Sequence, residues 1–379
     1  MAPHQRGDRV FPQLNSFALA AAKFYFAAMI QPSMPTADML YLAGEDQEAF
    51  HRKAALVTRA QFGNQVFVRG VVEVSNYCRE NCAYCGMRRS NRTLDRFRAD
   101  YEQIAELLIH HRPASMTDVN IQAGEDPVAV REVVLPLIQT LRRETDLGIS
   151  VCLGSLNHSM YADLKNAGAG IYIIKFEIAN PKMYAAMESP GQFDQRIANI
   201  CHLAKTGWRV SSGFIAGLPG QTTEDVLANF NLAAQLPLDG CSVSPFIPGE
   251  ETPLANESMA GIDLTLNCMA ALRLMRPDWV IPSVSALNIA GAGTGYRRGL
   301  RTGANLVTIN LTPADFRENY LLYKRNRFIM TEERILNAVA AEGLEPSTQS
   351  LADFYGTRKA NGTATHAAEP APQTTAASA

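Results

Sequence analysis

Short apolar runs rich in valine and isoleucine alternate with longer segments of helical period through most of the chain. This alternation is typical of a parallel sheet whose strands are joined and covered by helices. The expected strands are Val66–Val74, Asp118–Gln122, Ile149–Leu153, Ile171–Glu177, Arg209–Ala216, Cys241–Pro245, Val280–Ser285 and Leu306–Asn310. The helices expected between them are Tyr101–His111, Val128–Thr145, Ser159–Asn166, Arg196–Ala204, Glu224–Gln235, Leu264–Met275 and Arg297–Thr302.

Eight such units over about 250 residues fit an α/β fold, the (β/α)8 barrel of the TIM type. A doubly wound open sheet is the competing fold. No Gly/Ser linker interrupts residues 45–355, so we expect one barrel domain there. A helical extension is expected over residues 1–44, where Lys23 makes the stretch Phe17–Gln31 amphipathic and too short to span a membrane. Residues 356–379 are dominated by small and polar side chains, which predicts a disordered tail.

The composition excludes several classes of protein. The 379 residues are 47% hydrophobic, enough for a large core, and their formal net charge of -2 gives no global positive field. We therefore expect no nucleic acid and no membrane as partners. Seven cysteines, three of them within one eight-residue stretch, favour reduced thiols at a metal over a disulfide framework. That pattern predicts a cytoplasmic protein.

The three clustered cysteines follow the first expected strand. Cys78, Cys82 and Cys85 are separated by three and then two residues. In a barrel, the chemistry lies at the carboxyl ends of the strands. Three thiolates in one loop can bind three corners of an iron–sulfur cube, and no fourth cysteine lies nearby to close the last iron. Zinc completed by a histidine such as His51 or His110 is the alternative metal site, and an electron carrier is the alternative iron–sulfur protein.

This cysteine spacing, with Tyr84 just before the last cysteine, resembles the signature of the radical S-adenosylmethionine (SAM) superfamily. The resemblance implies a [4Fe–4S] cluster on Cys78, Cys82 and Cys85, with SAM chelated to the open iron. It further implies that one electron from the cluster cleaves SAM to a 5′-deoxyadenosyl radical. Tyr84 would pack near the adenine, and a reductant such as flavodoxin or ferredoxin would supply the electron.

Later strand ends add to the resemblance. Gly124 and Glu125 are similar to the segment that presents carbonyls and a carboxylate to the SAM ammonium, although alone they read as an ordinary turn. Glu177 matches an acid that holds the SAM ribose or amino group. Arg196 resembles the arginine that pairs with the SAM carboxylate; taken by itself, it would be a solvated cation.

The fifth strand end resembles the turn that binds adenine in this superfamily, and here Ile215, Gly217 and Leu218 would contact the base. A Walker phosphate loop is excluded, because no Lys-Ser/Thr follows the glycines. Within the superfamily, the chain resembles the group of biotin synthase, [FeFe]-hydrogenase maturase and methylornithine synthase. The maturase that works with SAM alone is matched best, over Glu73–Arg89 and Gly217–Thr222.

Other positions depart from that group. Biotin synthase needs further cysteines for a second cluster, and only Cys152 stands at a matching place. Lys175 replaces the maturase arginine, and Ser283 and Ser285 stand where the maturase has threonines. Asn288 lies where methylornithine synthase is expected to have an acid. We expect Lys175, Ser283, Ser285 and Asn288 to form the catalytic, substrate-facing half of the cavity, which would suit an anionic or carboxylate-bearing molecule.

The resemblance predicts reductive cleavage of SAM and maturase-like chemistry on a small substrate that contains sulfur or an amino acid, free or bound to iron. The alternatives are an amino-acid rearrangement like that of methylornithine synthase and carbon–sulfur bond formation as in biotin or lipoate synthesis. An iron–sulfur or zinc scaffold, or an electron carrier, is the non-enzymatic alternative. We also expect Cys201, Cys241 and Cys268 to be buried in the core.

Overall fold

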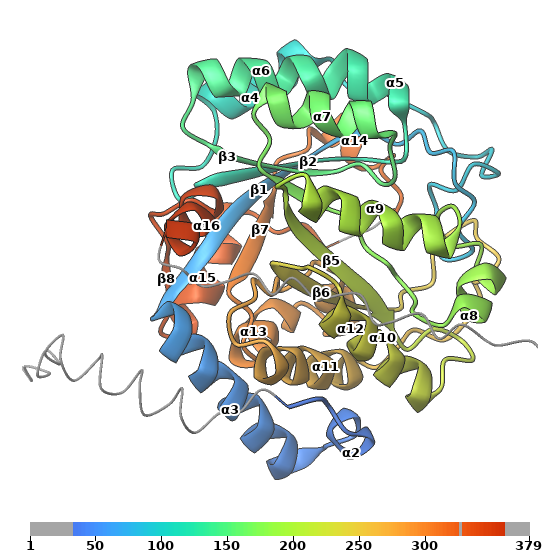
Figure 1. Cartoon of the computed structure of the whole chain (residues 1–379), viewed down its shortest axis with the longest axis vertical. Helices are drawn as coiled ribbons and strands as arrows, with labels where there is room; N and C mark the ends of the chain where they lie inside the picture. The colour runs from blue at the N-terminus through green and yellow to red at the C-terminus, as the bar shows by residue number, and fades with distance from the viewer. Residues whose placement is uncertain (1–32, 326–327, 361–379) are drawn as a thin grey trace, which may run out of the picture.

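A computed structural model gives the structure of residues 33–325 and 328–360 (Figure 1). Seven parallel strands form a continuous sheet in the order β6-β5-β4-β3-β2-β1-β7, and a short β8 pairs with β1. The strands are β1 Gln65–Ser75, β2 Asp118–Ala123, β3 Gly148–Cys152, β4 Ile171–Ile173, β5 Arg209–Ala216, β6 Gly240–Pro245, β7 Leu306–Asn310 and β8 Glu345–Pro346. The helix expected over Phe17–Gln31 lies outside the described residues, as does the chain beyond residue 360.

Helices surround this sheet. Those that link successive strands are α4 Tyr101–His110, α5 Pro127–Ala129, α6 Leu135–Glu144, α7 His158–Ala167, α8 Pro181–Ala186, α9 Phe193–Lys205, α10 Thr223–Gln235, α11 Ile262–Met275, α12 Ala286–Ala290 and α13 Gly295–Arg301. A π-helical turn, η1 Val130–Val134, joins α5 to α6, so the helix expected over Val128–Thr145 is confirmed with a local irregularity. The flanking helices are α2 Ala37–Leu40, α3 Gly44–Phe62, α14 Ala314–Arg317, α15 Glu332–Ala341 and α16 Leu351–Ala360. In the described ranges, no helix is long and apolar enough to cross a membrane.

One expected strand, Val280–Ser285, does not form. This segment makes only isolated parallel bridges, from Val280 to Gly240 of β6 and from Pro282 to Leu306 of β7. It still links the two ends of the sheet, so the expected barrel closes. The strand prediction was wrong because Pro282 has no N–H for a ladder, and because the chain turns into α12 directly after this segment.

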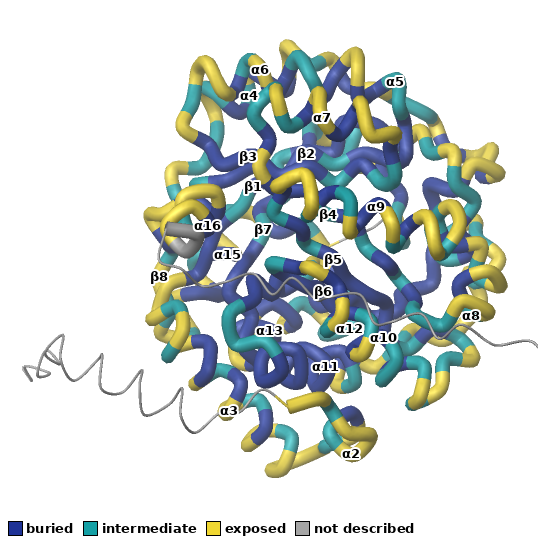
Figure 2. Tube along the Cα trace, in the orientation of Figure 1, coloured by how far each residue is buried: buried dark blue, intermediate teal, exposed yellow. Residues whose placement is uncertain are grey.

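Alternation along the strands separates the core from the lumen. In β1, Val68, Val72 and Val74 pack in the main apolar cluster under the helices, whereas Arg69 and Glu73 line the central cavity. Successive side chains of a strand point to opposite faces of the sheet, and here the inner face carries polar side chains beside apolar ones such as Val71. Figure 2 shows the strands buried and the exposed positions on the outer sides of the helices. The barrel therefore carries its chemistry inside.

Helix α16 closes the end of the barrel at which the strands begin. Its Leu351 and Tyr355 pack in one apolar cluster with the first residues of several strands. The Leu351 amide donates to both carboxylate oxygens of Asp118, at 3.1 and 3.0 Å. This helix continues past residue 355, where we expected the barrel to end, because its apolar face covers the barrel floor. The cavity therefore opens at the opposite end, where the strands finish.

Candidate active site

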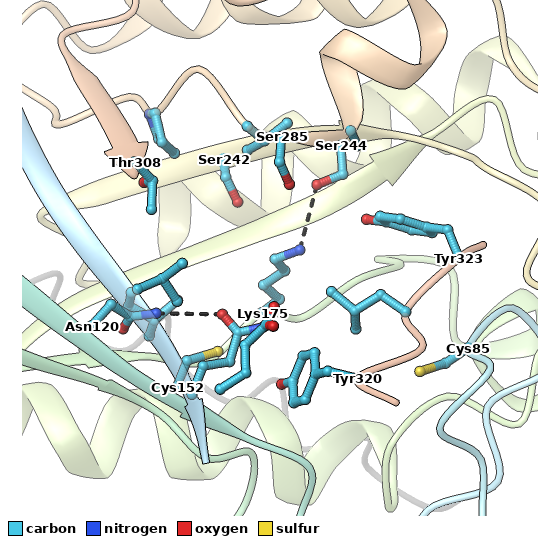
Figure 3. A pocket seen from close by; sticks show the side chains of 18 of the residues that line it. Cys85, Asn120, Cys152, Lys175, Ser242, Ser244, Ser285, Thr308, Tyr320 and Tyr323 are labelled. Carbon is cyan, nitrogen blue, oxygen red and sulfur yellow. Dashed lines mark hydrogen bonds between the residues drawn. The ribbon is translucent and has the colours of Figure 1, made fainter. Parts of the chain in front are cut away.

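A cavity of about 330 Å³ occupies the lumen and the carboxyl ends of the strands. Its size is that of a site for a small organic ligand. All three clustered cysteines line one part of it, and Lys175 and Ser285 line another (Figure 3). The barrel thus brings the two halves of the expected site into one continuous space.

The cysteine loop packs tightly on the end of β2, and Gly124 makes this approach possible. A Cβ added at Gly124 would lie 2.2 Å from the carbonyl oxygen of Tyr77 and 2.9 Å from Cβ of Cys78. The backbone amide of Glu125 lies 3.4 Å from Sγ of Cys78 and donates to it. Any other residue at position 124 would push the first cysteine away from the strand end, so this glycine is required by sterics.

The three thiols fit an iron–sulfur cube. Burial raises the pKa of Cys78 and Cys82, and it raises the pKa of Cys85 to about 12, so the thiolate forms need a bound cation. Within the described residues, no three His, Cys, Asp or Glu side chains gather closely enough to hold one metal ion. A cube offers a separate iron to each thiolate and does not require such a gathering.

Two arginines that the sequence analysis missed hold this loop in shape. The Arg96 guanidinium donates to the carbonyl oxygens of Asn76 at 2.5 Å and Met87 at 2.9 Å, and also to two further loop carbonyls. The Arg88 side chain is buried and pairs with Glu188 at 2.8 Å. The signal for them was the high density of arginines directly after the last cysteine. These cations replace the regular secondary structure that the loop lacks.

Arg196 and Glu125 bind one another. Nη1 of Arg196 lies 2.8 Å from Oε1 of Glu125, and both side chains are more than nine-tenths buried. Arg196 also donates to Oγ of Ser155 at 2.9 Å and to the carbonyl oxygen of Lys175 at 2.9 Å. Burial raises the pKa of Glu125 even though Arg196 opposes the shift. A Cβ at Gly154 would lie 2.0 Å from the Glu125 side chain, so this second glycine also belongs to the site.

Glu177 occupies an unusual backbone conformation beyond the end of β4. The strand stops at Ile173, although we expected it to reach Glu177. Glu177 has a φ of 62°, yet its amide donates to Gly213 and its carbonyl accepts from Ile215, both at 3.0 Å. The backbone is therefore fixed to β5 while the side chain faces the cavity. Its carboxylate has no hydrogen bond or ion pair with any described residue, which leaves it available to a ligand.

An apolar slot lies beside the cysteine loop. Tyr84 packs against a cluster that includes Ile215, Leu218 and Phe246, and its hydroxyl donates to Oγ of Ser189 at 3.3 Å. Tyr84, Ile215 and Phe246 line the cavity, whereas Leu218 lies beneath them in the cluster. A flat aromatic ligand would be sandwiched by such side chains. Of the residues expected at the adenine, Tyr84 and Ile215 therefore face the slot, whereas Leu218 does not.

The turn after β5 is held by its own side chains. Gly217 has a φ of 80°, and a Cβ there would lie 2.5 Å from Cβ of Ala260. The amides of Gly217 and Leu218 donate to Oε1 of Gln221, at 2.7 and 3.3 Å. The Gln221 side chain donates in turn to the carbonyl oxygen of Ile215 at 3.0 Å. This glycine is needed for the turn and does not line the cavity itself.

Lys175 extends into the lumen toward Ser244, and its Nζ lies 3.4 Å from Oγ of that serine (Figure 3). Burial lowers the pKa of Lys175, but attraction to Glu177 and to Tyr323 outweighs burial, so the pKa is raised. The side chain therefore stays a cation. Ser285 lines the same part of the cavity, as expected.

Ser283 and Asn288 do not line the cavity, contrary to our expectation. Oγ of Ser283 donates to the carbonyl oxygen of Tyr296 at 3.2 Å. Oδ1 of Asn288 accepts from the Tyr296 amide at 2.9 Å, and its amide group contacts Sδ of Met330. Ser283 turns away because the alternate positions Val280, Pro282 and Val284 face the cavity. Asn288 turns away because it lies within helix α12. Both residues hold the loop around α12 and α13 in place.

The sequence analysis missed several polar groups of the lumen. Arg69, Asn120, Ser242 and Thr308 all line the cavity from strand positions. Nη2 of Arg69 lies 3.4 Å from Oγ1 of Thr308, and its buried Nε has no hydrogen-bond partner in the part of the chain that the structure describes. Following the two-residue period inward along each expected strand would have found all four.

Comparisons with known proteins identify the superfamily of this chain. The family model "Radical SAM superfamily" matches residues 72–233. The chain belongs to this superfamily, and it is an enzyme whose cofactors are a [4Fe–4S] cluster and SAM.

Within the superfamily, the chain is similar to the [FeFe] hydrogenase maturase subunit HydE of Thermotoga maritima. They are 33% identical over 276 residues, which cover 73% of this chain and 79% of that protein. A 3-methylornithine synthase of Methanosarcina barkeri is 26% identical over 318 residues, 82% of this chain and 88% of that protein. The crystal structure of methylornithine synthase (PylB) has the same fold, with a TM-score of 0.75, 24% identity and coverage of 88% of this chain and 99% of that one.

The unpartnered carboxylate of Glu177 leads to a prediction on SAM affinity. Glu177→Gln should weaken SAM binding by about 1–1.5 kcal/mol, because a charge-assisted hydrogen bond becomes a neutral one. Iron content should stay at the wild-type value, and the free energy of unfolding should change little. The carboxylate makes no hydrogen bond or ion pair with a described residue, and the variant loses only its attraction to Lys175. Equilibrium dialysis with labelled SAM measures the effect, and exposed Glu257→Gln is the matched control. Unchanged SAM binding in Glu177→Gln would remove this residue from the SAM site.

Proposed function

We propose that the protein cleaves SAM reductively at a cluster on Cys78, Cys82 and Cys85 and acts on a small anionic molecule held near Lys175. The observation that carries this proposal is the single cavity that joins the three thiols to the cation in the lumen. Bound together, the cluster and SAM supply a 5′-deoxyadenosyl radical. The remaining residues bind, orient and enclose the reactants.

The SAM half of the cavity consists of the cysteine loop, the apolar slot and the carboxylate of Glu177. Tyr84 and Ile215 would hold the adenine between apolar surfaces, and Glu177 would accept a hydrogen bond from the ribose or amino group. The buried pair of Arg196 and Glu125 would face the methionine part of SAM. Arg196 would donate to the carboxylate of this methionine part, and Glu125 would accept from its ammonium group.

The substrate half consists of the deeper lumen. Lys175 contributes a mobile cation, and Ser244 and Ser285 contribute hydroxyl groups around it. This set recognises a carboxylate or another small anion. We propose a substrate that contains sulfur or an amino acid, free or bound to iron, because the cysteine loop and the adenine turn resemble the hydrogenase maturase.

The alternative reactions have less support. An amino-acid rearrangement like that named for 3-methylornithine synthase would need a partner for a substrate amine near Asn288, and that side chain is bonded to Tyr296 and Met330. Sulfur insertion from a second cluster would need several further cysteines in the lumen. In the described residues, Cys152 is the one cysteine beyond the three ligands that lines the cavity.

Lys175→Met tests the division of the cavity into two halves. The variant should lose every stimulation of turnover by substrate while basal cleavage of SAM with dithionite continues. A panel of amino acids, with and without ferrous iron, is first screened for compounds that increase 5′-deoxyadenosine formation by the wild type. Exposed Lys182→Met is the matched control. If Lys175→Met loses both activities, or keeps both, the proposed division is wrong.

The remaining partners follow from the chemistry. Radical SAM enzymes act on small molecules and need a reductant. We propose an acidic electron carrier such as flavodoxin or ferredoxin, and a cytoplasmic location. All seven cysteines are free thiols, which supports a reducing compartment.

A further inference from the structure

The loop that carries the cysteines has a strong positive charge in a chain that is slightly acidic. Residues 78–98 contain six arginines and two acids, whereas the whole chain has a formal net charge of -2. The excess of positive charge is therefore local to this loop. Its members differ in what they contact, so they are considered one by one.

Three of the six arginines make contacts that hold the loop in shape. Arg96 donates to four backbone carbonyls, Arg88 pairs with Glu188, and Arg98 pairs with Asp126 at 2.7 Å. These three guanidinium groups explain the shape of the loop and leave little for a partner.

Arg89 and Arg92 remain. Both are exposed, and neither side chain has a hydrogen bond or ion pair with any described residue. Their side chains make none of the contacts that hold the loop in shape. The Arg89 amide donates to the carbonyl oxygen of Glu80 at 2.8 Å, and the neighbouring Arg79 has an exposed guanidinium that contacts Glu80 and Glu125. Unpartnered cations on a rigid loop are free to meet an acidic surface.

A second loop adds to the same face. The amide of Gly86 donates to the carbonyl oxygen of Leu322 at 3.3 Å, which places residues 320–325 beside the cysteine loop. Lys324 and Arg325 are exposed there. We call the exposed cations of the two loops, Arg79, Arg89, Arg92, Lys324 and Arg325, the cationic face. Four acids lie near these loops. Glu80 accepts from the Gly191 amide at 2.9 Å, Glu188 pairs with Arg88, the Glu250 amide donates to the carbonyl oxygen of Tyr323 at 2.7 Å, and Asp95 is exposed.

Cys85 packs against a small cluster of Met87, Leu94, Tyr320 and Leu321, and those residues come from the two loops that bear the cations. A protein docked on the cationic face would therefore lie behind the third cysteine, on the outer side of the cavity wall. Figure 2 shows exposed positions along this loop, at the right-hand edge of the view.

We propose that the cationic face is the docking surface for an acidic one-electron carrier protein of the flavodoxin type. The inference rests on the proposed cluster. In the transfer, the reduced carrier loses one electron and the oxidised cluster gains one, and no bond forms between the proteins. Charge complementarity favours this partner over an uncharged one, and steering by such a surface raises the association rate by about 10 to 1,000 times at low salt.

The double variant Arg89→Glu/Arg92→Glu tests the surface. Anaerobic stopped-flow absorbance follows reduction of the cluster in the full chain by fully reduced flavodoxin. The second-order rate constant should fall about tenfold or more at low ionic strength, and the difference should shrink at high salt. The extent of cluster reduction by dithionite, and SAM cleavage driven by dithionite, should match the wild type.

Arg52→Glu/Lys53→Glu on α3 is the control, because it changes the net charge equally at exposed positions of another element. An equal loss of rate in this control, or wild-type rates in both double variants, would overturn the docking surface. Binding to phosphatidylserine vesicles that depends on Arg89 and Arg92, with unchanged flavodoxin rates, would overturn it as well. If the wild type forms no reducible cluster, the proposed function itself fails, and dithionite reveals this separately.

Discussion

Cys82→Ala is expected to reduce the formation of 5′-deoxyadenosine to background. Cys82 is buried and lines the cavity between the other two proposed ligands in the chain. A cube held by only two thiolates would leave two irons open to solvent and exchange. After anaerobic reconstitution, the variant should hold far less iron and acid-labile sulfide than the wild type, and its cluster absorbance should be absent.

Two other cysteines serve as controls. Cys201 is exposed on α9, although we expected it in the core, and Cys201→Ala should keep wild-type iron content and SAM cleavage. Cys152→Ala should also keep the cluster, since this thiol lines the lumen away from the cysteine loop (Figure 3). If Cys82→Ala still produced 5′-deoxyadenosine, the assignment of the three cluster ligands would be wrong.

Much of the barrel follows from local pattern, because buried strands and amphipathic helices each leave a period in the sequence. The prediction of a strand over Val280–Ser285 was wrong for a reason that is local in the sequence, and a second feature of this segment is non-local. Pro282 was visible in the sequence and argues against a central strand. The contacts to β6 and β7 that still close the barrel depend on two strands far away in the chain, and no local pattern contains them.

The candidate site likewise contains some residues that the sequence identifies and others whose positions only the folded chain determines. Cys78, Cys82 and Cys85 are recognisable because their spacing within one loop determines which groups they can bind together. The orientation of Ser283 depends on Tyr296, which lies 13 positions later, in helix α13. The ion pair of Arg196 and Glu125 likewise joins residues 71 positions apart, and only the folded barrel brings them together.

This ion pair leads to the second large prediction. Arg196→Ala should lower the free energy of unfolding by about 3–5 kcal/mol, because it leaves the buried carboxylate of Glu125 without its cation. It also removes hydrogen bonds to Ser155 and to the carbonyl oxygen of Lys175. Chemical denaturation of the protein without cluster or SAM measures the loss, so the result does not depend on activity.

Arg79→Ala provides a matched comparison on the same carboxylate. Nε of Arg79 lies 3.4 Å from Oε2 of Glu125, but the Arg79 side chain is 50% exposed. An exposed partner contributes about 0–1 kcal/mol, so this variant should remain near the wild-type stability. A similar loss in the two variants would show that the carboxylate, rather than the burial of its partner, determines the cost.

The double variant Arg196→Met/Glu125→Gln separates charge from packing. Arg196→Met keeps much of the buried volume and leaves Glu125 charged, so its loss should approach that of Arg196→Ala. Neutralising Glu125 in the same molecule removes the unpaired charge and should recover a large part of the stability. SAM binding should not recover, because the pair would then offer neither the cation nor the carboxylate to the methionine group. Recovery of both properties would assign the pair to the fold alone, and recovery of neither would show that its hydrogen bonds to Ser155 and Lys175 outweigh its charge.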